Sequence, residues 1–216
     1  MKNKRVIIIG GEGNGSVIAD AITDAKCDAE VAGFLNDLVK PGELIAGYPV
    51  FGALADIGRF IEEGYFFVFT IYRIDGQQQR IKLLRSLNIP QEQLFSFIHP
   101  QAYVASTAKI GKGTIIMPQV SISSEAVIGD CCLVMVNASV GHNTIIGDHC
   151  HLAAQCCISS RVFIKGGVHI GLNATVREHL TLNNFSTLGM GSVLLSNIGE
   201  KEIWAGNPAR FLRNAE

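Results

Sequence analysis

Aliphatic side chains recur at every sixth position through the second half of the chain. The series runs from Ile98 to Leu194, and Ile, Val or Leu occupies each of its seventeen positions. A period of six fits neither the 3.6-residue turn of a helix nor the alternation of an ordinary strand. It fits a three-sided coil in which each short side uses six residues and the aliphatic side chain points inward. We therefore predict a stacked parallel β-structure over residues 96–216.

The residues between the aliphatic positions support this prediction. The fourth position after each aliphatic residue is mostly Ala, Ser, Thr or Cys, as a narrow and densely packed core requires. Three of the six cysteines, Cys132, Cys150 and Cys156, occupy this position, so we expect packing residues rather than disulfide partners. Glycine directly follows the aliphatic residue at several corners, where we expect the backbone to use the wide range of angles open to glycine: Gly111, Gly129, Gly141, Gly147, Gly171 and Gly189.

Residues 1–95 carry a different pattern, in which short apolar runs alternate with helix-like stretches. Strands are predicted at 6–9, 31–35 and 66–71, and helices after Gly15 and at about 77–87. Prolines at positions 90 and 100 punctuate the passage into the six-residue series. This order predicts a small α/β domain over residues 1–95, followed by the coil.

A glycine-rich loop, Gly10–Gly15, comes directly after the first predicted strand. Backbone N–H groups at the start of the following helix can meet a phosphate there. The spacing is not that of the dinucleotide fingerprint, because its third glycine would fall on Ser16, and we do not expect NAD. The loop is either a tight turn without a ligand or a site for the diphosphate of a ligand.

Charge and hydropathy exclude several classes of partner. The chain has 18 basic and 19 acidic side chains, so no excess of positive charge favours nucleic acid or an anionic membrane. The apolar run near the start, residues 6–9, is too short for a secretory signal, and no later run reaches the length of a membrane span. We expect a cytoplasmic protein with reduced thiols.

Several motifs together resemble one family over nearly the whole chain. They are the glycine loop, the segment Gly33–Asp37, the six-residue series, Gly141-His142-Asn143 and the ending Gly206–Arg210. The chain resembles the bacterial left-handed β-helix sugar acetyltransferases, which include sialic acid O-acetyltransferase and the UDP-4-amino-sugar N-acetyltransferases. The resemblance implies a Rossmann-like α/β domain that binds a nucleotide-linked amino sugar. It also implies a homotrimer with acetyl-CoA between adjacent left-handed β-helices.

The catalytic base that the resemblance implies is His142. A neutral imidazole can accept a proton from a sugar amine or hydroxyl as that group attacks the thioester, and can then release the proton to the departing thiolate. In the amino-sugar members a carboxylate follows this histidine, whereas Asn143 follows it here. An amide can orient the ring but adds no negative charge, so either Asp130 or Asp148 replaces the carboxylate or the base is weaker.

The remaining site residues also follow from the resemblance. His151 matches the histidine that the family places beside acetyl-CoA, Leu172 and Met190 match groove-lining positions, and Gly171 and Gly189 leave room for the cofactor. The family's glycine loop carries a histidine that meets the sugar, and Asn14 holds that slot between Gly13 and Gly15. Asn36 and Asp37 fall where the family reads the nucleotide base. His169, His149 and His179 have no such support, and we expect them on turns or outer faces.

Three alternatives remain open at this stage. The acceptor is either an amino group, which we favour, or a hydroxyl group of a sugar. A zinc site built from His142, His149 and His151 would suit a carbonic anhydrase, but such an enzyme has no use for a nucleotide-binding domain, and we expect no metal. A trimeric scaffold that binds a nucleotide-sugar without catalysis is the alternative outside the enzymes. Trp204 is expected to cap the last coil.

Overall fold

A computed structural model describes residues 3–72 and 75–215. Its first part is an α/β unit whose five-stranded sheet has the order β3-β4-β2-β1-β5. The strands are β1 (Lys4–Ile9), β2 (Ala29–Leu35), β3 (Leu44–Ile45), β4 (Tyr48–Gly52) and β5 (Phe66–Phe69). The helices are α1 (Asn14–Asp24), the short η1 (Leu54–Asp56) and α2 (Ile57–Glu62). The three predicted strands and the helix after Gly15 are confirmed, although β5 ends at Phe69 rather than at residue 71.

The central strand β1 is buried on both of its faces. Val6 and Ile8 pack with Ile18 of α1, in a cluster that continues into the second part of the chain. Ile7 and Ile9 pack on the other side with Phe60 of α2. β1 pairs in parallel with both β2 and β5. Burial on both faces explains why residues 6–9 of β1 form an uninterrupted apolar run.

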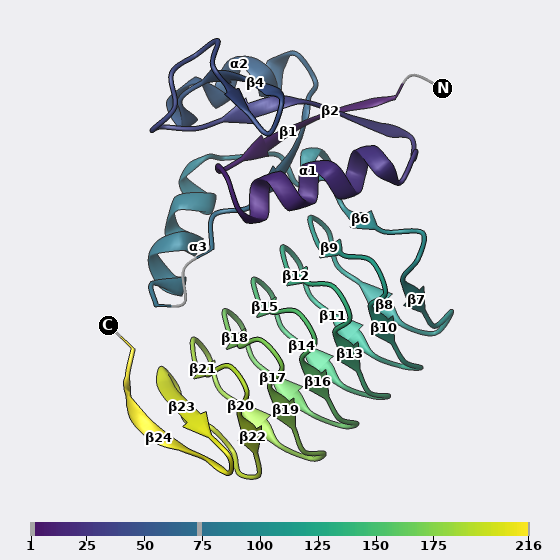
Figure 1. The fold of residues 1–216 in the computed structure, drawn as a ribbon, viewed down its shortest axis with the longest axis vertical. Helices are drawn as coiled ribbons and strands as arrows, with labels where there is room; N and C mark the ends of the chain where they lie inside the picture. The colour runs from purple at the N-terminus through teal and green to yellow at the C-terminus, as the bar shows by residue number, and fades with distance from the viewer. Residues whose placement is uncertain (1–2, 73–74, 216) are drawn as a thin grey trace.

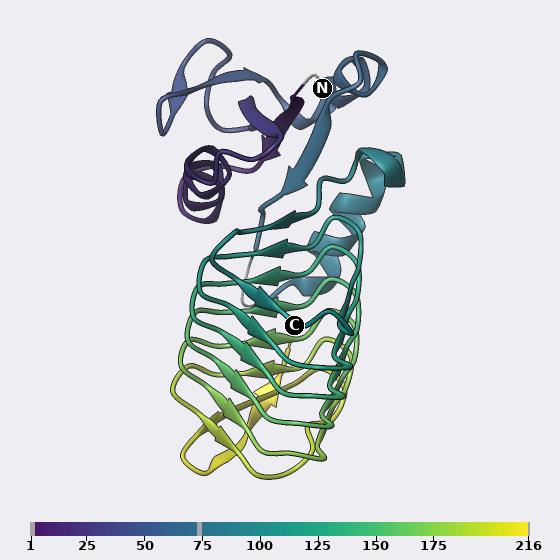
Figure 2. The same cartoon turned by 90° about the vertical axis from the view of Figure 1, so that its right-hand side faces the viewer.

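The second part is a three-sided stack of short parallel strands (Figures 1 and 2). One side holds β7 (Tyr103–Val104), β10 (Ser121–Ile122), β13 (Ser139–Val140), β16 (Cys157–Ile158), β19 (Thr175–Val176) and β22 (Val193–Leu194). The second holds β8 (Lys109–Ile110), β11 (Val127–Ile128), β14 (Ile145–Ile146), β17 (Phe163–Ile164) and β20 (Thr181–Leu182). The third holds β6 (Phe97–Ile98), β9 (Ile115–Ile116), β12 (Leu133–Val134), β15 (His151–Leu152), β18 (His169–Ile170), β21 (Thr187–Leu188), β23 (Glu202–Gly206) and β24 (Ala209–Asn214).

Strand pairing confirms that one coil uses three six-residue units. Val127 pairs with Ile145, and Ile145 pairs with Phe163, so each strand meets the strand 18 residues further along. From Ile116 onward the aliphatic positions are fully buried, and so are the small residues such as Thr144 at the fourth position. The cysteines are free, with Cys132, Cys150 and Cys156 buried as predicted. This arrangement fits a left-handed parallel β-helix.

Glycine is required at the corners for a different reason from the one predicted. The left-handed backbone falls three residues after the aliphatic position, for example at Asn143, and not at Gly171 or Gly189. A Cβ at Gly171 would lie 2.5 Å from the backbone nitrogen of Met190 in the next coil, and a Cβ at Gly189 would lie 2.8 Å from the Cβ of Ala205. The corners therefore need glycine because adjacent coils approach closely, and not because of its backbone freedom.

The connection between the two parts places a helix on the stack. α3 (Gln77–Ser86) and η2 (Gln91–Gln93) precede β6, and α3 lies alongside the coils (Figure 2). The Gln77 amide nitrogen donates to Thr187 Oγ1 at 2.9 Å, and Arg80 donates to the backbone oxygen of His149. A helix that the sequence assigns to the first domain therefore packs on the second.

An antiparallel pair closes the far end of the stack. β23 pairs in parallel with β21 and antiparallel with β24. Trp204 lies in β23, and its Nε1 donates to Glu202 at 2.8 Å while its ring packs against the core. This position agrees with the predicted capping role. Among the described residues, no helix is long and apolar enough to cross a membrane.

Candidate active site

An apolar pocket of about 550 Å³ lies at one corner of the stack. All five predicted cofactor-binding residues line it: His151, Gly171, Leu172, Gly189 and Met190. The other lining residues are Asn14, Tyr72, Met135, Ala153, Ala154, His169, Thr187, Ile203, Ala205 and Leu212. The Leu172 and Met190 side chains are 50% and 67% exposed, so the pocket opens to the surface beside them. Its lining suits a long and largely apolar ligand arm.

A second pocket, of about 630 Å³, lies at the carboxyl ends of β1 and β2. Asn14, Asn36 and Asp37 of the predicted substrate set line it, together with Gly10, Gly11, Glu12, Leu38, Val39, Leu54, Thr70, Ile71 and Tyr72. Gly13 and Gly15 are not among its lining residues. Gly13 precedes α1 with a φ of +86°, and Gly15 is buried where an added Cβ would lie 3.1 Å from the ring of Phe34. Both glycines therefore shape the loop that carries Asn14.

The Asn36 and Asp37 side chains hold the walls of this second pocket. Asn36 donates its amide to the backbone oxygen of Gly10 at 2.8 Å, and its Oδ1 accepts from the backbone nitrogens of Leu38 and Val39. Asp37 Oδ1 accepts from the backbone nitrogen of Leu54 at 2.8 Å. The Asn36 side chain thus ties the turn after β2 to the glycine loop. Asp37 remains exposed beside the pocket.

The two pockets adjoin, because Asn14 and Tyr72 line both of them. Asn14 is the first residue of α1, and Tyr72 follows β5. A ligand that reaches from the glycine loop past Asn14 would therefore enter the apolar pocket on the stack. The two halves of the chain therefore contribute to two adjoining pockets.

His142 and Asn143 lie at a different corner of the stack, in the turn between β13 and β14. Both side chains are exposed, and neither lines the apolar pocket. His142 Nδ1 lies 2.8 Å from Asn143 Oδ1. An amide oxygen only accepts hydrogen bonds, so in this contact Nδ1 of His142 is the donor.

A second histidine, His169, lies beside His151 in the apolar pocket. The sequence places His169 on a turn or an outer face, but it is the first residue of β18 and is only 8% exposed. The signal that could have found it is its distance in sequence from His151, which is one coil of 18 residues. Burial lowers the pKa of His151 to about 3 and that of His169 to about 4. Both rings are therefore neutral at physiological pH.

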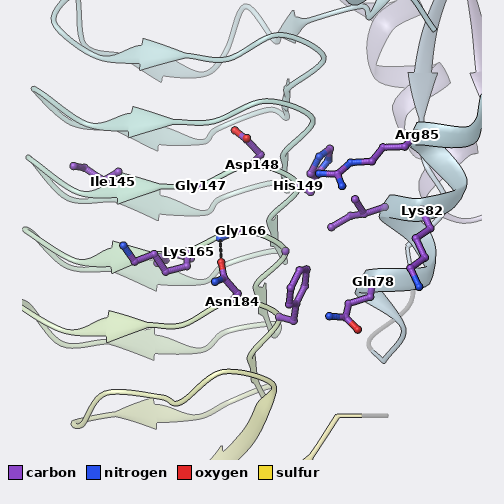
Figure 3. Close-up of a pocket in the computed structure, with 14 residues that line it drawn as sticks. Gln78, Lys82, Arg85, Ile145, Gly147, Asp148, His149, Lys165, Gly166 and Asn184 are labelled. Atoms are coloured by element: carbon purple, nitrogen blue, oxygen red, sulfur yellow. Dashed lines mark hydrogen bonds between the residues drawn. The ribbon is translucent and has the colours of Figure 1, made fainter. Parts of the chain in front are cut away.

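A third cavity, of about 630 Å³, separates α3 from another corner of the stack (Figure 3). Arg85 of α3 lies beside His149 of the coils, and Lys82 and Lys165 also line the cavity. Burial, together with the positive charge of Arg80, lowers the pKa of His149. His142, His149 and His151 thus occupy three different places around the stack. Among the described residues, no group of three metal-ligating side chains is positioned to hold a metal ion.

Comparison with known proteins agrees with this architecture. The three-sided stack defines the class of hexapeptide-repeat, left-handed β-helix proteins. The family model described as the GMPPB C-terminal domain matches residues 94–203. The chain therefore belongs to that family, and it is similar to bacterial sugar N-acetyltransferases.

Three relatives cover different amounts of the chain. The perosamine N-acetyltransferase of Caulobacter crescentus, solved with CoA and GDP-perosamine, is 26% identical and has a TM-score of 0.85 over 97% of each chain. The acetyltransferase domain of PglB from Neisseria gonorrhoeae, solved with acetyl coenzyme A, is 25% identical with the same TM-score, over 97% of this chain and all of that one. The UDP-N-acetylbacillosamine N-acetyltransferase of Bacillus subtilis is 31% identical over 118 residues, which span 53% of this chain and about half (51%) of that enzyme.

Proposed function

We propose that the chain transfers an acetyl group from acetyl-CoA to the amino group of a nucleotide-linked sugar used in surface polysaccharide or glycan synthesis. The observation that carries the proposal is the junction of the two pockets at Asn14 and Tyr72. It lets a nucleotide-sugar seated at the glycine loop present its sugar to the apolar pocket. The relatives solved with CoA and GDP-perosamine, or with acetyl coenzyme A, support this choice of ligands.

The residues of the apolar pocket fit the acetyl-CoA arm. Gly171 and Gly189 have no side chains to fill the pocket, and Leu172 and Met190 offer apolar contact along it. The Nε2 atom of His151 is buried and has no hydrogen-bond partner. A buried polar atom without a partner is costly, and a ligand that bonds to it would remove the cost. We assign the thioester to the neighbourhood of this atom.

In this proposal the Rossmann-like domain binds the nucleotide-linked sugar. The N–H groups at the start of α1 meet the diphosphate, and Asn14 meets the sugar. Asp37 accepts a hydrogen bond from the nucleotide base, while Asn36 keeps the neighbouring turn in place. Comparison of UDP-, GDP- and dTDP-linked sugars as substrates would identify the nucleotide base.

His142 acts as the general base. Its Nε2 takes a proton from the sugar amine as the amine nitrogen forms a bond to the thioester carbon. The C–S bond then breaks, and His142 returns the proton to the CoA thiolate. Asn143 holds the ring by accepting from Nδ1–H. The transfer is direct, so no covalent acyl-enzyme is required.

His142 and the apolar pocket lie at different corners of one chain, so the proposal requires a second copy. In a homotrimer, the corner of one stack that carries His142 lies against the pocket corner of its neighbour. Each active site then combines the pocket of one copy with the base of the next. In the relative from Caulobacter crescentus, the variant solved with CoA and GDP-perosamine carries asparagine in place of a histidine.

The test is a CoA-release assay with a panel of UDP-, GDP- and dTDP-linked sugars. Each nucleotide is offered as the amino sugar and as the matching hydroxyl sugar. Release with an amino sugar alone supports N-acetylation, whereas release with hydroxyl sugars alone would identify an O-acetyltransferase. Tight nucleotide binding without release across the whole panel would identify a scaffold and reject the proposal.

A further inference from the structure

His151 and His169 form a pair on adjacent strands of the same face. They occupy the same register in β15 and β18, and their Nδ1 atoms are 3.1 Å apart. The two ring centroids are 4.9 Å apart and the rings are tilted by 53°. Both rings line the apolar pocket. A contact of this length between two Nδ1 atoms is a hydrogen bond, so one ring donates and the other accepts.

The pair is covered by residues from the segment after β5 and from α3. The Tyr72 ring lies 4.7 Å from the His151 ring, and the Arg80 guanidinium lies 4.2 Å from the Tyr72 ring. On the next coil Thr187 is held by Gln77 of α3. The carboxylate of Asp75, whose negative charge partly offsets the lowering of the His169 pKa by burial, forms a salt bridge with Arg213. The segment after β5 and the helix α3 thus hold the two rings in place against the stack.

The proton count of the pair links the two rings. Burial lowers both pKa values, so two neutral rings carry two ring protons in total. One proton lies between the Nδ1 atoms, and the other must then be on Nε2 of the accepting ring. If His169 donates, His151 Nε2 carries a proton. If His151 donates, His151 Nε2 is a bare acceptor.

We propose that His169 is a positioning residue that donates its Nδ1–H to His151 and thereby keeps the buried Nε2 of His151 protonated and directed at the thioester carbonyl oxygen. The inference rests on the proposed function, because that oxygen can only accept a hydrogen bond. A donor fixed in this place stabilises the negative charge that develops on the oxygen as the amine attacks. The unpartnered Nε2 of His151 is the atom that would make this contact.

Two substitutions of His169 test the assignment. His169→Phe keeps a ring but has no donor, whereas His169→Asn places an amide nitrogen the same number of bonds from the backbone as Nδ1. The tautomer of His151 is read from two-bond ¹H–¹⁵N correlations of the imidazole nitrogens. We expect His151 to be protonated at Nε2 in the wild type and in His169→Asn, and to become a tautomer mixture in His169→Phe.

Kinetics give the second readout. His169→Phe should lower kcat about 10- to 100-fold, somewhat less than the loss of a complete oxyanion donor, while leaving the KM for acetyl-CoA nearly unchanged. His169→Asn should recover most of the lost rate. A structural role alone would change stability in both variants and would not separate phenylalanine from asparagine.

The inference and the proposed function fail in different ways. The imidazole spectra need no substrate, and wild-type spectra that show His151 protonated at Nδ1 would overturn the inference. A wild-type kcat in His169→Phe would also overturn it. Failure of the proposed function would instead appear as absent CoA release by the wild-type protein with every sugar nucleotide.

Discussion

At the scale of single residues, Asn143 meets two demands at once. Its φ of +58° lies in the left-handed region, which asparagine tolerates better than most side chains. Its Oδ1 also accepts the hydrogen bond that sets the tautomer of His142. The chain thus obtains an oriented ring from a neutral amide, where the amino-sugar members that it resembles use a carboxylate.

Removal of the base should separate catalysis from cofactor binding. We expect His142→Ala to lower kcat by about 10² to 10⁴, because the attacking amine loses its proton acceptor, with acetyl-CoA affinity near the wild-type value. Asn143→Gly is the matched companion, since glycine accepts the positive φ but lacks the amide, and its kcat should fall less. Steady-state kinetics and calorimetric titration with acetyl-CoA measure both variants. Wild-type turnover in His142→Ala would remove this residue from the mechanism.

The buried histidine pair should make the protein sensitive to mild acid. In the unfolded chain each ring binds a proton below about pH 6.5, but burial lowers the folded pKa of His151 to about 3 and of His169 to about 4. The unfolded state therefore binds more protons between these limits. The contribution of these two histidines to the free energy of unfolding is greatest above about pH 6.5. It falls as the pH decreases toward 4, by up to about 1.4 kcal/mol per pH unit for each histidine.

Urea unfolding at several pH values between 7 and 5 measures this effect. His169→Phe should show a shallower decrease in the free energy of unfolding than the wild type, because one of the two groups no longer titrates. His179→Asn, a substitution at an exposed turn with a φ of +62°, should keep the wild-type slope. Equal slopes in His169→Phe and the wild type would contradict the lowered pKa values.

At the scale of the elements, close stacking of the coils sets the identity of the corner residues. The space next to Gly171 is filled by the backbone of Met190, whereas nothing lies within 4 Å of a Cβ built at Gly191. Gly191 has a φ of +64°, and asparagine occupies the same left-handed position in other coils, such as Asn137 and Asn173. Two glycines on the same face are thus required for different reasons.

This difference predicts that two glycine substitutions change the free energy of unfolding by different amounts. Gly171→Ala should lower the free energy of unfolding by about 1 to 3 kcal/mol, because its Cβ forces adjacent coils apart. Gly191→Asn should change it by less than about 1 kcal/mol, since asparagine tolerates the left-handed backbone and meets open space. Denaturant unfolding of both variants decides the matter. Equal losses would mean that backbone conformation, and not coil spacing, limits these corners.

The same contrast explains what the sequence could and could not predict. The coils repeat one local pattern, so the core positions and the three residues Cys132, Cys150 and Cys156 follow directly from their spacing. The place of α3 depends on Gln77 and Arg80, polar residues whose partners Thr187 and His149 lie far along the chain. No periodicity signals such contacts. His169 could not be predicted for a related reason, because it pairs with His151 one coil away at an outward position of the strands, which the aliphatic period does not mark.

At the scale of the whole molecule, the α/β unit and the stack share one site. Tyr72 leaves the last strand of the sheet, contacts the His151 ring and lines both pockets. The path from the glycine loop to the apolar pocket therefore lies within a single chain. The proposed base does not, because His142 is on another corner of the stack.

A mixing experiment decides whether the active site is shared between copies. His142→Ala removes the base, and Ala154→Trp places a large ring in the apolar pocket, where Ala154 is half-buried. Each variant alone should be inactive. In every trimer that contains both variants, about one third of the sites combine an intact pocket with an intact His142 from the neighbour. Co-expression with two affinity tags isolates the mixed trimers for the CoA-release assay. Recovery of about a third of wild-type turnover is expected, whereas no recovery would place the base and the pocket in the same copy.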